Sequence, residues 1–423
     1  MPETPSSQQK PAAPAILPRR VLRVRGTSVT LIEEVRARAA QDLGVDVVFE
    51  VLDFPTCQHS AATDPDGYDI YEQCFHNLDI VWFWGALQPI QIERIGDWDR
   101  ISSLAKLGGI SKFAPQGFGD APVRKLYVQP GGFLGPEPGQ TISMLPTTYH
   151  MDSFGYDPRI FGAAGGAEAS WAWLLDPRAK GRIAVVDEPA IGLFDLAMAV
   201  EAAGKMRFTD LGNMTVAEID RLMALLEDYR KQGYFHATWR NIHEANALLN
   251  ARAVSVQSMW APSYATLGGI EDEFAEAVPR EGYRAWHGGA SLSRHLAGAQ
   301  LDLAYDYLNW WLSGWAGAVM ARQGYYMSVP ERVRAVLTPA EWDYWYEGLP
   351  AVRDLCDAMV ERAREEAKPA TSDVGTSTNG WALPGSNRRH PRCKRGALPA
   401  ELKALTRQVY ESRPTTLGVA GLS

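Results

Sequence analysis

The sequence predicts an α/β protein built on open, mostly parallel sheets, and two observations lead to this class. Segments rich in β-branched residues alternate with helical segments near the N-terminus and again in the middle of the chain. Parallel strands joined by helices favour a sheet with helices on both faces. In addition, 423 residues, of which 46% are hydrophobic, suffice for one large core or two medium ones, so the length allows two lobes.

The first ordered segment is a strand–helix–strand unit. Residues 21–25 alternate as a strand, 31–43 have a helical pattern, and 45–52 form a second β-rich run. The turn Gly26-Thr27-Ser28 lies between strand and helix, where free backbone N–H groups and two hydroxyls suit a polar ligand group. An ordinary helix N-cap explains the same residues equally well, and both interpretations stay open.

The alternation of strands and helices continues along the chain. Helix starts are marked by two capping boxes, Thr215 with Glu218 and Thr338 with Glu341. Further strands or extended segments are predicted at residues 67–72, 87–90, 126–128, 144–156, 182–187, 253–259 and 284–287. Further helices are predicted at residues 77–84, 171–175, 191–203, 215–231, 242–249, 302–323 and 350–367.

The two ends of the chain have the composition of disordered or loosely ordered segments. Residues 1–20 are rich in Pro, Ser, Gln and Ala and have no apolar stretch of the kind found in a secretory signal. This composition leaves three alternatives open: the leader was removed and replaced, the start site is misplaced, or the protein stays in the cytoplasm. Residues 368–396 predict a flexible loop, and 397–423 predict a short charged helix followed by a tail.

Composition argues against several classes of partner. A net charge of −8 gives no basic surface for nucleic acid, and no run approaches the roughly 20 apolar residues of a membrane-spanning helix. No CxxC or HExxH spacing marks a metal site, so we expect no metal and no cofactor. Cys57 and Cys74 could form a disulfide in an oxidising compartment or remain as two semi-buried thiols.

The sequence gives little support to an enzyme. It lacks GxSxG, GxGxxG and GxxxxGK[ST], the commonest nucleophile and phosphate motifs. The adjacent carboxylates Asp187 and Glu188 would point to opposite faces of one strand, so they could not flank a scissile bond together. We therefore predict a binding protein and not an enzyme.

One block of the sequence resembles a known family. Residues 170–188 read SWAWLLDPRAKGRIAVVDE and are similar to the stretch SWADLWDPEYKGKVALLDD of the extracellular solute-binding proteins of polyamine-type ABC importers. Weaker similarities lie at 244–253, at Trp260, and at 305–313 leading to Gly324-Tyr325. The likeness extends over about residues 21–330.

The resemblance implies a type II periplasmic-binding fold, in which two α/β lobes are joined by crossing strands that act as a hinge and close on a solute. It assigns 21–148 with 288–335 to lobe 1, and 149–287 with 336–367 to lobe 2. It also implies a monomeric, periplasmic substrate-binding protein that delivers its solute to the permease subunits of an ABC transporter. An intracellular sensor on the same fold, or an enzyme built on it, are the alternatives.

The family's pocket can be carried over by position, because open α/β sheets bind ligands at the carboxyl ends of their strands. Asp152 and His287 are added from their local polarity, and Glu188 is the strongest candidate, with a helix N-cap as its alternative role. The expected ligand-binding residues are Thr27, Ser28, Cys74, Phe75, His76, Tyr149, Asp152, Glu188, Trp260, Trp286, His287 and Tyr325.

Three departures from the family pattern bear on the solute. Gly26 to Ser28 stand where polyamine binders have aromatic residues, and Ile191 and Gly288 stand where they have carboxylates. Each buried ammonium of a linear polyamine needs its own carboxylate or aromatic face, so spermidine itself fits poorly. The sequence thus predicts a small polar or cationic solute of polyamine-like, quaternary-amine, opine-like or amino-acid-like type.

Overall fold

The computed structural model of the chain describes residues 20–108, 122–162, 169–260, 274–349, 351–355 and 358. The predictions for residues 368–396 and 397–423, nearly all of 1–20, and most of the expected helix at 350–367 lie outside these residues. Among the residues that it does describe, no helix is long and apolar enough to cross a membrane.

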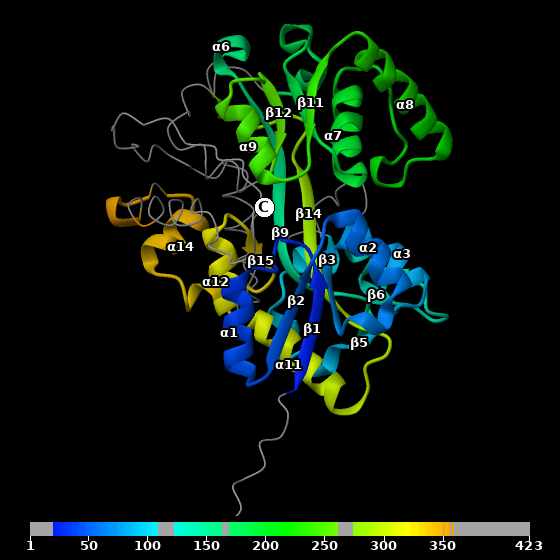
Figure 1. Cartoon of the computed structure of the whole chain (residues 1–423), viewed down its shortest axis with the longest axis vertical. Coiled ribbons are helices and arrows are strands. Elements are labelled where there is room, and N and C mark those ends of the chain that lie inside the picture. The colour runs from blue at the N-terminus through cyan, green and yellow to red at the C-terminus, as the bar shows by residue number, and fades with distance from the viewer. Residues whose placement is uncertain are drawn as a thin grey trace, which may run out of the picture.

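The described strands and helices alternate through most of the chain (Figure 1). The strands are β1 Val21–Gly26, β2 Asp46–Val51, β3 Ile70–Cys74, β4 Leu87–Gln88, β5 Ile90–Gln91, β6 Tyr127–Val128, β7 Leu134–Gly135, β8 Thr141–Ile142, β9 Leu145–Tyr156, β10 Ile183–Val186, β11 Phe235–Trp239, β12 Val256–Met259, β13 Ala275–Glu276, β14 Arg284–Ser293 and β15 Tyr326–Met327. The helices are α1 Glu33–Leu43, α2 Phe54–Thr63, α3 Leu78–Phe83, α4 Ser103–Leu107, α5 Val123–Leu126, α6 Pro158–Phe161, α7 Pro189–Ala202, α8 Val216–Lys231, α9 Ile242–Asn250, α11 Gly298–Leu312, α12 Trp315–Arg322, α13 Pro330–Arg334 and α14 Pro339–Trp345.

The main sheet consists of two parallel groups joined by an antiparallel pair. Its strand order is β11-β10-β12-β9-β14-β3-β1-β2. Strands β3, β1 and β2 are parallel to one another, as are β12, β10 and β11. The long strands β9 and β14 are antiparallel to each other and to their outer neighbours β12 and β3. Parallel strands need long crossovers, which the helices provide.

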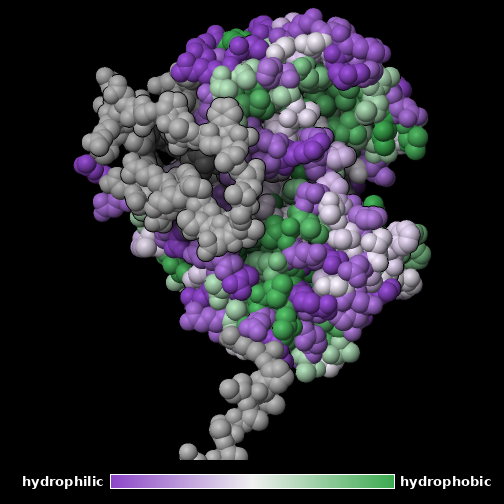
Figure 2. All heavy atoms as spheres, viewed as in Figure 1, coloured by the Kyte–Doolittle hydropathy of each residue, from purple (hydrophilic) through white to green (hydrophobic). Residues whose placement is uncertain are grey.

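The two parallel groups belong to separate lobes (Figure 1). We call the part around β1, β2 and β3 lobe 1, and the part around β10, β11 and β12 lobe 2. Lobe 1 has one large core that includes Leu22, Ile70 and Trp311, whereas lobe 2 is built around Trp171 and Trp239 in two smaller clusters. In Figure 2 the outline of the molecule narrows between the two lobes on one side. The two-lobed α/β class predicted from the sequence is confirmed.

Strands β9 and β14 run through both lobes. Within lobe 1, Gly288 to Leu292 of β14 pair with β3; within lobe 2, Ser153 to Tyr156 of β9 pair with β12. Between these regions the two strands pair with each other, from Arg284 opposite Asp152 to Ala290 opposite Leu145. The segment predicted at 144–156 as an extended crossing is thus correct, and the predicted return strand at 284–287 continues to Ser293.

Local sequence signals explain where several elements begin. Both predicted capping boxes are present: the Thr215 hydroxyl accepts a hydrogen bond from the Glu218 amide, and Thr338 and Glu341 repeat this arrangement. The turn at Gly26 is not an N-cap, because α1 begins at Glu33 after Ile32 and has no side-chain cap. Of the two interpretations of that turn, the N-cap is therefore wrong.

The structure differs from the sequence analysis at two further elements. The helix expected at 302–323 is two helices, because Gly314 has φ 109° and a Cβ there would collide with the backbone of Arg332. Strand β11 was not predicted, although its residues alternate between half-buried and exposed positions. Trp342 of α14, and Tyr346 after it, belong to the same hydrophobic core as Leu22 and Ile70. The lobe boundaries, including the assignment of 336–367 to lobe 2, stay a proposal.

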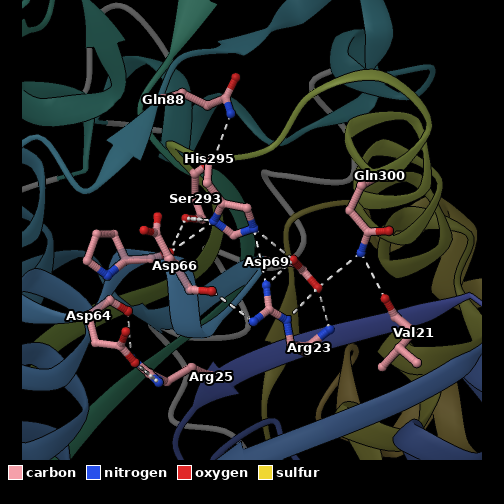
Figure 3. A network of polar contacts seen from close by, with 11 residues as sticks. Val21, Arg23, Arg25, Asp64, Asp66, Asp69, Gln88, Ser293, His295 and Gln300 are labelled. Carbon is pink, nitrogen blue, oxygen red and sulfur yellow. Dashed lines mark hydrogen bonds and ion pairs between the residues drawn. The ribbon is translucent and has the colours of Figure 1, made fainter.

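A buried aspartate ties lobe 1 together at the end of the sheet away from the lobe junction (Figure 3). Asp69, which is 1% exposed, accepts hydrogen bonds from the backbone N (2.7 Å) and Nη2 (2.9 Å) of Arg23. It also contacts His295 Nε2 at 3.1 Å and Gln300 Nε2 at 3.1 Å. Burial would raise the pKa of Asp69, but the hydrogen bonds from Arg23 and His295 outweigh burial and lower it.

We expect Asp69→Asn to destabilise the protein by about 2 to 4 kcal/mol, because it removes charge-assisted hydrogen bonds from a buried site. Since the folded-state pKa of Asp69 is depressed, its contribution is present above the ordinary aspartate pKa and is lost as the pH falls below that value. The difference in unfolding free energy between wild type and variant should therefore shrink under acidic conditions. Urea titrations from pH 7 to pH 3 measure it.

The matched control is Asp66→Asn. Asp66 is exposed, and its backbone carbonyl accepts a hydrogen bond from Arg23 Nη1. The substitution changes only the side chain and keeps this hydrogen bond. A loss of stability in this control equal to that of Asp69→Asn, or a constant difference across the pH range, would contradict the assignment.

Candidate functional site

The carboxyl ends of strands from both lobes meet at one junction. Cys74 ends β3 in lobe 1, and Glu188 follows β10 in lobe 2. Burial raises the pKa of the Cys74 thiol, and the charges of Asp152 and Glu188 raise it further while Arg284 lowers it. Cys74 pairs with Gly288 of β14, and Arg284 of the same strand donates a hydrogen bond to Asp195 of lobe 2. The strand ends of the two lobes therefore lie near each other at the junction.

Side chains also touch across the junction. The rings of Phe54 in α2 and Trp260 after β12 are 6.1 Å apart in an edge-to-face arrangement. Arg124 Nη1 of lobe 1 lies 2.9 Å from Asp210 Oδ2 of lobe 2. Trp260 packs in turn on Trp239 in the core of lobe 2, with ring centroids 4.8 Å apart. The structure thus has the two lobes in contact.

Glu188 combines burial with an unpaired oxygen. It occupies the N-cap position of α7 and is 8% exposed, and its Oε2 has no hydrogen-bond partner among the described residues. Burial raises its pKa, although the nearby amides of Ile191 and Ala190 and the charge of Arg284 oppose the rise. Its neighbour Asp187 points away and pairs with exposed Arg240 at 2.8 Å. The two carboxylates therefore have separate environments, as the strand pattern predicts.

A buried ion triad lies beside Glu188. Arg284 of β14 donates from Nε to Asp195 Oδ1 at 2.6 Å and from Nη2 to Asp152 Oδ2 at 3.0 Å. Asp195, on α7, is fully buried, and burial raises its pKa to about 6 against the pull of Arg284. Asp152 Oδ1 and Asp195 Oδ2 have no hydrogen-bond partner among the described residues, and His150 Nδ1 lies 3.7 Å from Asp152 Oδ1. The triad ties β9, β14 and α7 together and keeps two carboxylate oxygens unsatisfied.

His76 and His287 add no positive charge to the junction at neutral pH. Burial lowers the pKa of His287 to about 4. Burial also lowers the pKa of His76 to about 3, with the charges of Arg284 and Lys125 acting in the same direction. As neutral imidazoles, both can accept or donate hydrogen bonds. His76 Nε2 and His150 Nδ1 lack hydrogen-bond partners within the described structure.

Two groups of aromatic rings lie along the crossing strands at the junction. Trp286 meets Tyr325 edge to face with centroids 5.5 Å apart. Tyr149 stacks between His287 and Tyr326, at 5.5 and 5.6 Å. The faces of such rings bind cations, and the rings also pack on aliphatic groups.

A second feature of the junction was not expected from the sequence. A cavity of about 10 Å³, which we call the Glu72 chamber, lies between β3, β9 and β14. Several of its polar side-chain atoms have no hydrogen-bond partner among the described residues, namely Glu72 Oε1, Gln73 Nε2, Thr147 Oγ1 and Thr148 Oγ1. The chamber is lined by Thr27, Val29, Thr30, Glu72, Gln73, Cys74, Thr147, Thr148, Trp286, Gly288 and Gly289.

The twelve residues expected to bind the solute occupy different positions. Thr27, Cys74 and Trp286 line the Glu72 chamber. Ser28 is exposed on the turn after β1, and Phe75 packs in the core of lobe 1. The other seven, His76, Tyr149, Asp152, Glu188, Trp260, His287 and Tyr325, lie along β9, β14 or the strand ends at the junction. Their role in binding remains a prediction.

The sequence interpretation missed Arg284, Asp195 and Glu72. Arg284 sits next to the recognised Trp286, and a charged residue inside an otherwise apolar helix or strand, as Asp195 and Glu72 are, is the signal that could have identified them. Cys57 and Cys74 are both buried free thiols, which settles the open question of a disulfide. The described residues contain no group of three or more His, Cys, Asp or Glu side chains placed to hold a metal.

We expect Arg284→Met to cost about 3 to 5 kcal/mol of stability, because it leaves Asp152 and Asp195 buried without their counter-charge. Chemical unfolding at pH 7 measures the loss. Arg240→Met is the matched control, since its pair with Asp187 is exposed and worth at most about 1 kcal/mol. Equal losses in the two variants would show that the triad is not the stabilising unit described above.

Comparisons with known proteins identify the fold. No family model and no curated protein matches the chain. Among solved structures, the chain is similar to the spermidine/putrescine ABC transporter substrate-binding protein PotD of Streptococcus pneumoniae, with 12% identity, a TM-score of 0.53, and 82% of this chain and 98% of that chain covered. It is also similar to the TpPotD lipoprotein of Treponema pallidum, with 10% identity, a TM-score of 0.55, and 74% and 88% covered.

A third similar structure is the periplasmic binding protein AgtB of A. tumefaciens in complex with agropinic acid, with 13% identity, a TM-score of 0.50, and 76% and 86% covered. These neighbours are binding proteins and not enzymes. At such identities the likeness concerns the fold alone. The chain therefore has the type II periplasmic-binding-protein fold that is found in the substrate-binding proteins of spermidine/putrescine ABC transporters.

Proposed function

We propose that this protein is the substrate-binding component of an ABC importer and that it captures a small organic cation between its lobes. One observation carries the proposal: the junction has more buried acid than base. Three carboxylates, Asp152, Asp195 and Glu188, share one guanidinium, that of Arg284. With all four groups ionised, the sum is three negative charges against one positive charge.

An excess of buried negative charge is costly unless a cation compensates it. Glu188 Oε2, Asp152 Oδ1 and Asp195 Oδ2 are the oxygens of these carboxylates that have no hydrogen-bond partner among the described residues. His76 and His287 are neutral at pH 7 and do not supply the compensating charge. A solute cation between Glu188 and the rings of Trp260 and Trp286 would supply it.

The size of the solute follows from what the junction lacks. Ile191 and Gly288 offer no charge at two positions where polyamine binders of this fold are expected to have carboxylates. A long polyamine would leave ammonium groups unpaired there. A solute with one or two cationic groups on a short body fits the remaining acceptors. The A. tumefaciens neighbour binds agropinic acid, so the fold itself is compatible with solutes other than polyamines.

The capture cycle would be a hinge closure. Strands β9 and β14 connect the lobes, and a small change in their twist at the register shift between His287 and Gly289 would open the junction. Solute contacts to both lobes favour the closed form, which presents a continuous surface to the permease. Such a protein acts as a monomer outside the cytoplasm.

Glu188→Ala and Trp260→Ala should each abolish solute binding and leave the fold intact. A thermal-shift screen of amines, betaines, opine-like conjugates and amino acids identifies a ligand, because ligand at 100 times its dissociation constant adds about 2.7 kcal/mol of stability. Calorimetric titration then compares the variants. Asp187→Ala and Trp84→Ala are the controls, since Asp187 faces Arg240 and Trp84 is 64% exposed on lobe 1. Wild-type affinity in both site variants would show the pocket to be misplaced.

Phe54→Ala should weaken solute affinity several-fold through the closure equilibrium, because Phe54 touches Trp260 across the junction. Small-angle scattering should show a smaller radius of gyration with solute than without it in the wild type, and a smaller difference in the variant at equal solute concentration. Phe133→Ala, at a ring that is 75% exposed, is the control. Identical scattering of the wild type with and without bound solute would contradict hinge closure.

A further inference from the structure

The Glu72 chamber has the features of a built polar site. Three of its side chains, Glu72, Thr147 and Thr148, are at most 1% exposed, and each carries an oxygen that has no hydrogen-bond partner among the described residues. Buried polar atoms without partners are rare in folded proteins, because each costs free energy. Three of them around one cavity therefore indicate a place where a polar group binds.

Glu72 has no cationic partner of its own in the described structure. Its Oε2 accepts a hydrogen bond from the Tyr307 hydroxyl at 3.2 Å, and the Thr30 side chain also hydrogen bonds to this carboxyl. Both donors are uncharged. Burial raises the pKa of Glu72 to about 7, against the effect of these two hydrogen bonds. The group is thus poised to ionise when a cation comes next to it.

The chamber belongs to the same junction as Glu188. Cys74 lines the chamber, and the charge of Glu188 acts on the Cys74 thiol. Trp286 lines the chamber as well and touches Tyr325. A solute held at Glu188 by one end could therefore place its other end at the chamber.

A glycine keeps the chamber open. A Cβ at Gly288 would lie 2.5 Å from Thr148 Oγ1. Any other residue at position 288 would push against a chamber hydroxyl. The absence of a carboxylate at Gly288 is thus accompanied by a carboxylate at Glu72, on the neighbouring strand β3.

We infer that the Glu72 chamber receives a primary ammonium group of the solute, with Glu72 as its counter-ion and the hydroxyls of Thr147 and Thr148 as further acceptors. This inference rests on the proposed function and selects among the solute classes that it leaves open. A primary ammonium has three N–H donors, which match the three unsatisfied oxygens.

The volume of the chamber gives the selectivity. A cavity of about 10 Å³ accepts a group of the size of one water molecule. A primary ammonium is of that size. A trimethylammonium group is much larger and has no N–H donor, so it would leave all three oxygens unpaired. The chamber therefore favours primary amines over quaternary amines such as betaines.

Calorimetric titration with three matched pairs of probes tests this selectivity: 1,4-diaminobutane, 2-aminoethanol and 4-aminobutanoic acid, each against its fully N-methylated quaternary counterpart. We expect at least one primary amine to bind, with an affinity at least tenfold above that of its counterpart. Equal or tighter binding of the quaternary compounds overturns the inference and leaves the proposed function standing. Absence of saturable binding by all the probes overturns the inference, and the broader solute screen then decides the proposed function separately.

Variants locate the ammonium group. Glu72→Gln and Thr148→Val preserve the shape of the side chains. We expect Glu72→Gln to lower the affinity for the primary amine at least tenfold and Thr148→Val to lower it severalfold. Glu93→Gln, at an exposed residue of lobe 1, should leave the affinity unchanged. Circular dichroism and thermal melts check that the variants fold. If either chamber variant unfolds, Gly288→Ala, which narrows the chamber without removing a polar group, takes its place with the same expected loss. Wild-type affinity in the folded chamber variants, with binding lost in Glu188→Ala, would overturn the inference and support the proposed function.

Discussion

The pairing of β9 with β14 is the constraint on which the rest of the structure depends. In the described sheet, each parallel group is attached to one of these two strands, β3 to β14 and β12 to β9. Their mutual register therefore sets where the strand ends of the two lobes meet. Arg284 lies opposite Asp152 in that register and also reaches Asp195 on α7. The same guanidinium fixes the strand pair and carries the positive charge of the junction.

This arrangement explains why the junction is acidic and still folds. A single buried guanidinium shared by two aspartates has enough hydrogen bonds to keep both in place, but it leaves one oxygen of each unsatisfied. Glu188 adds a third carboxylate at the start of α7, where the helix dipole and nearby amides lower the cost of its charge. In the proposed function, the same groups supply both stability and binding capacity, since full satisfaction of these oxygens within the protein would leave none for a solute.

Much of the fold could be predicted because its determinants are local. Alternating apolar residues predicted β1, a continuous apolar run predicted β10, and capping boxes predicted the starts of α8 and α14. The break at Gly314 could not be predicted in this way, because the pattern of apolar residues continues across it and the reason for the break is a contact with Arg332, distant in the sequence. The lobe to which α14 belongs is likewise decided by packing of Trp342, which no local pattern reveals.

In the candidate site, too, residues marked by local sequence could be predicted, and residues placed by distant contacts could not. Glu188 and Trp260 could be proposed because each directly follows a strand, and strand ends are where such folds bind ligands. Arg284 and Asp195 are far apart in the sequence, and their pairing depends on the register of β14 and the position of α7.

Glu72 shows the limit most clearly. Side chains on β3 are buried on both faces, so the sequence pattern does not lead one to expect a carboxylate there. The role that we infer for Glu72 depends on the glycines and threonines that other parts of the chain place around it. From the sequence alone, glycine instead of a carboxylate at position 288 suggests a loss of binding capacity. In three dimensions the glycine leaves space for the Thr148 hydroxyl, which lines the same chamber as Glu72 of the neighbouring strand. The specificity of such a junction is therefore a property of the assembled strand ends, and a comparison of single positions misjudges it.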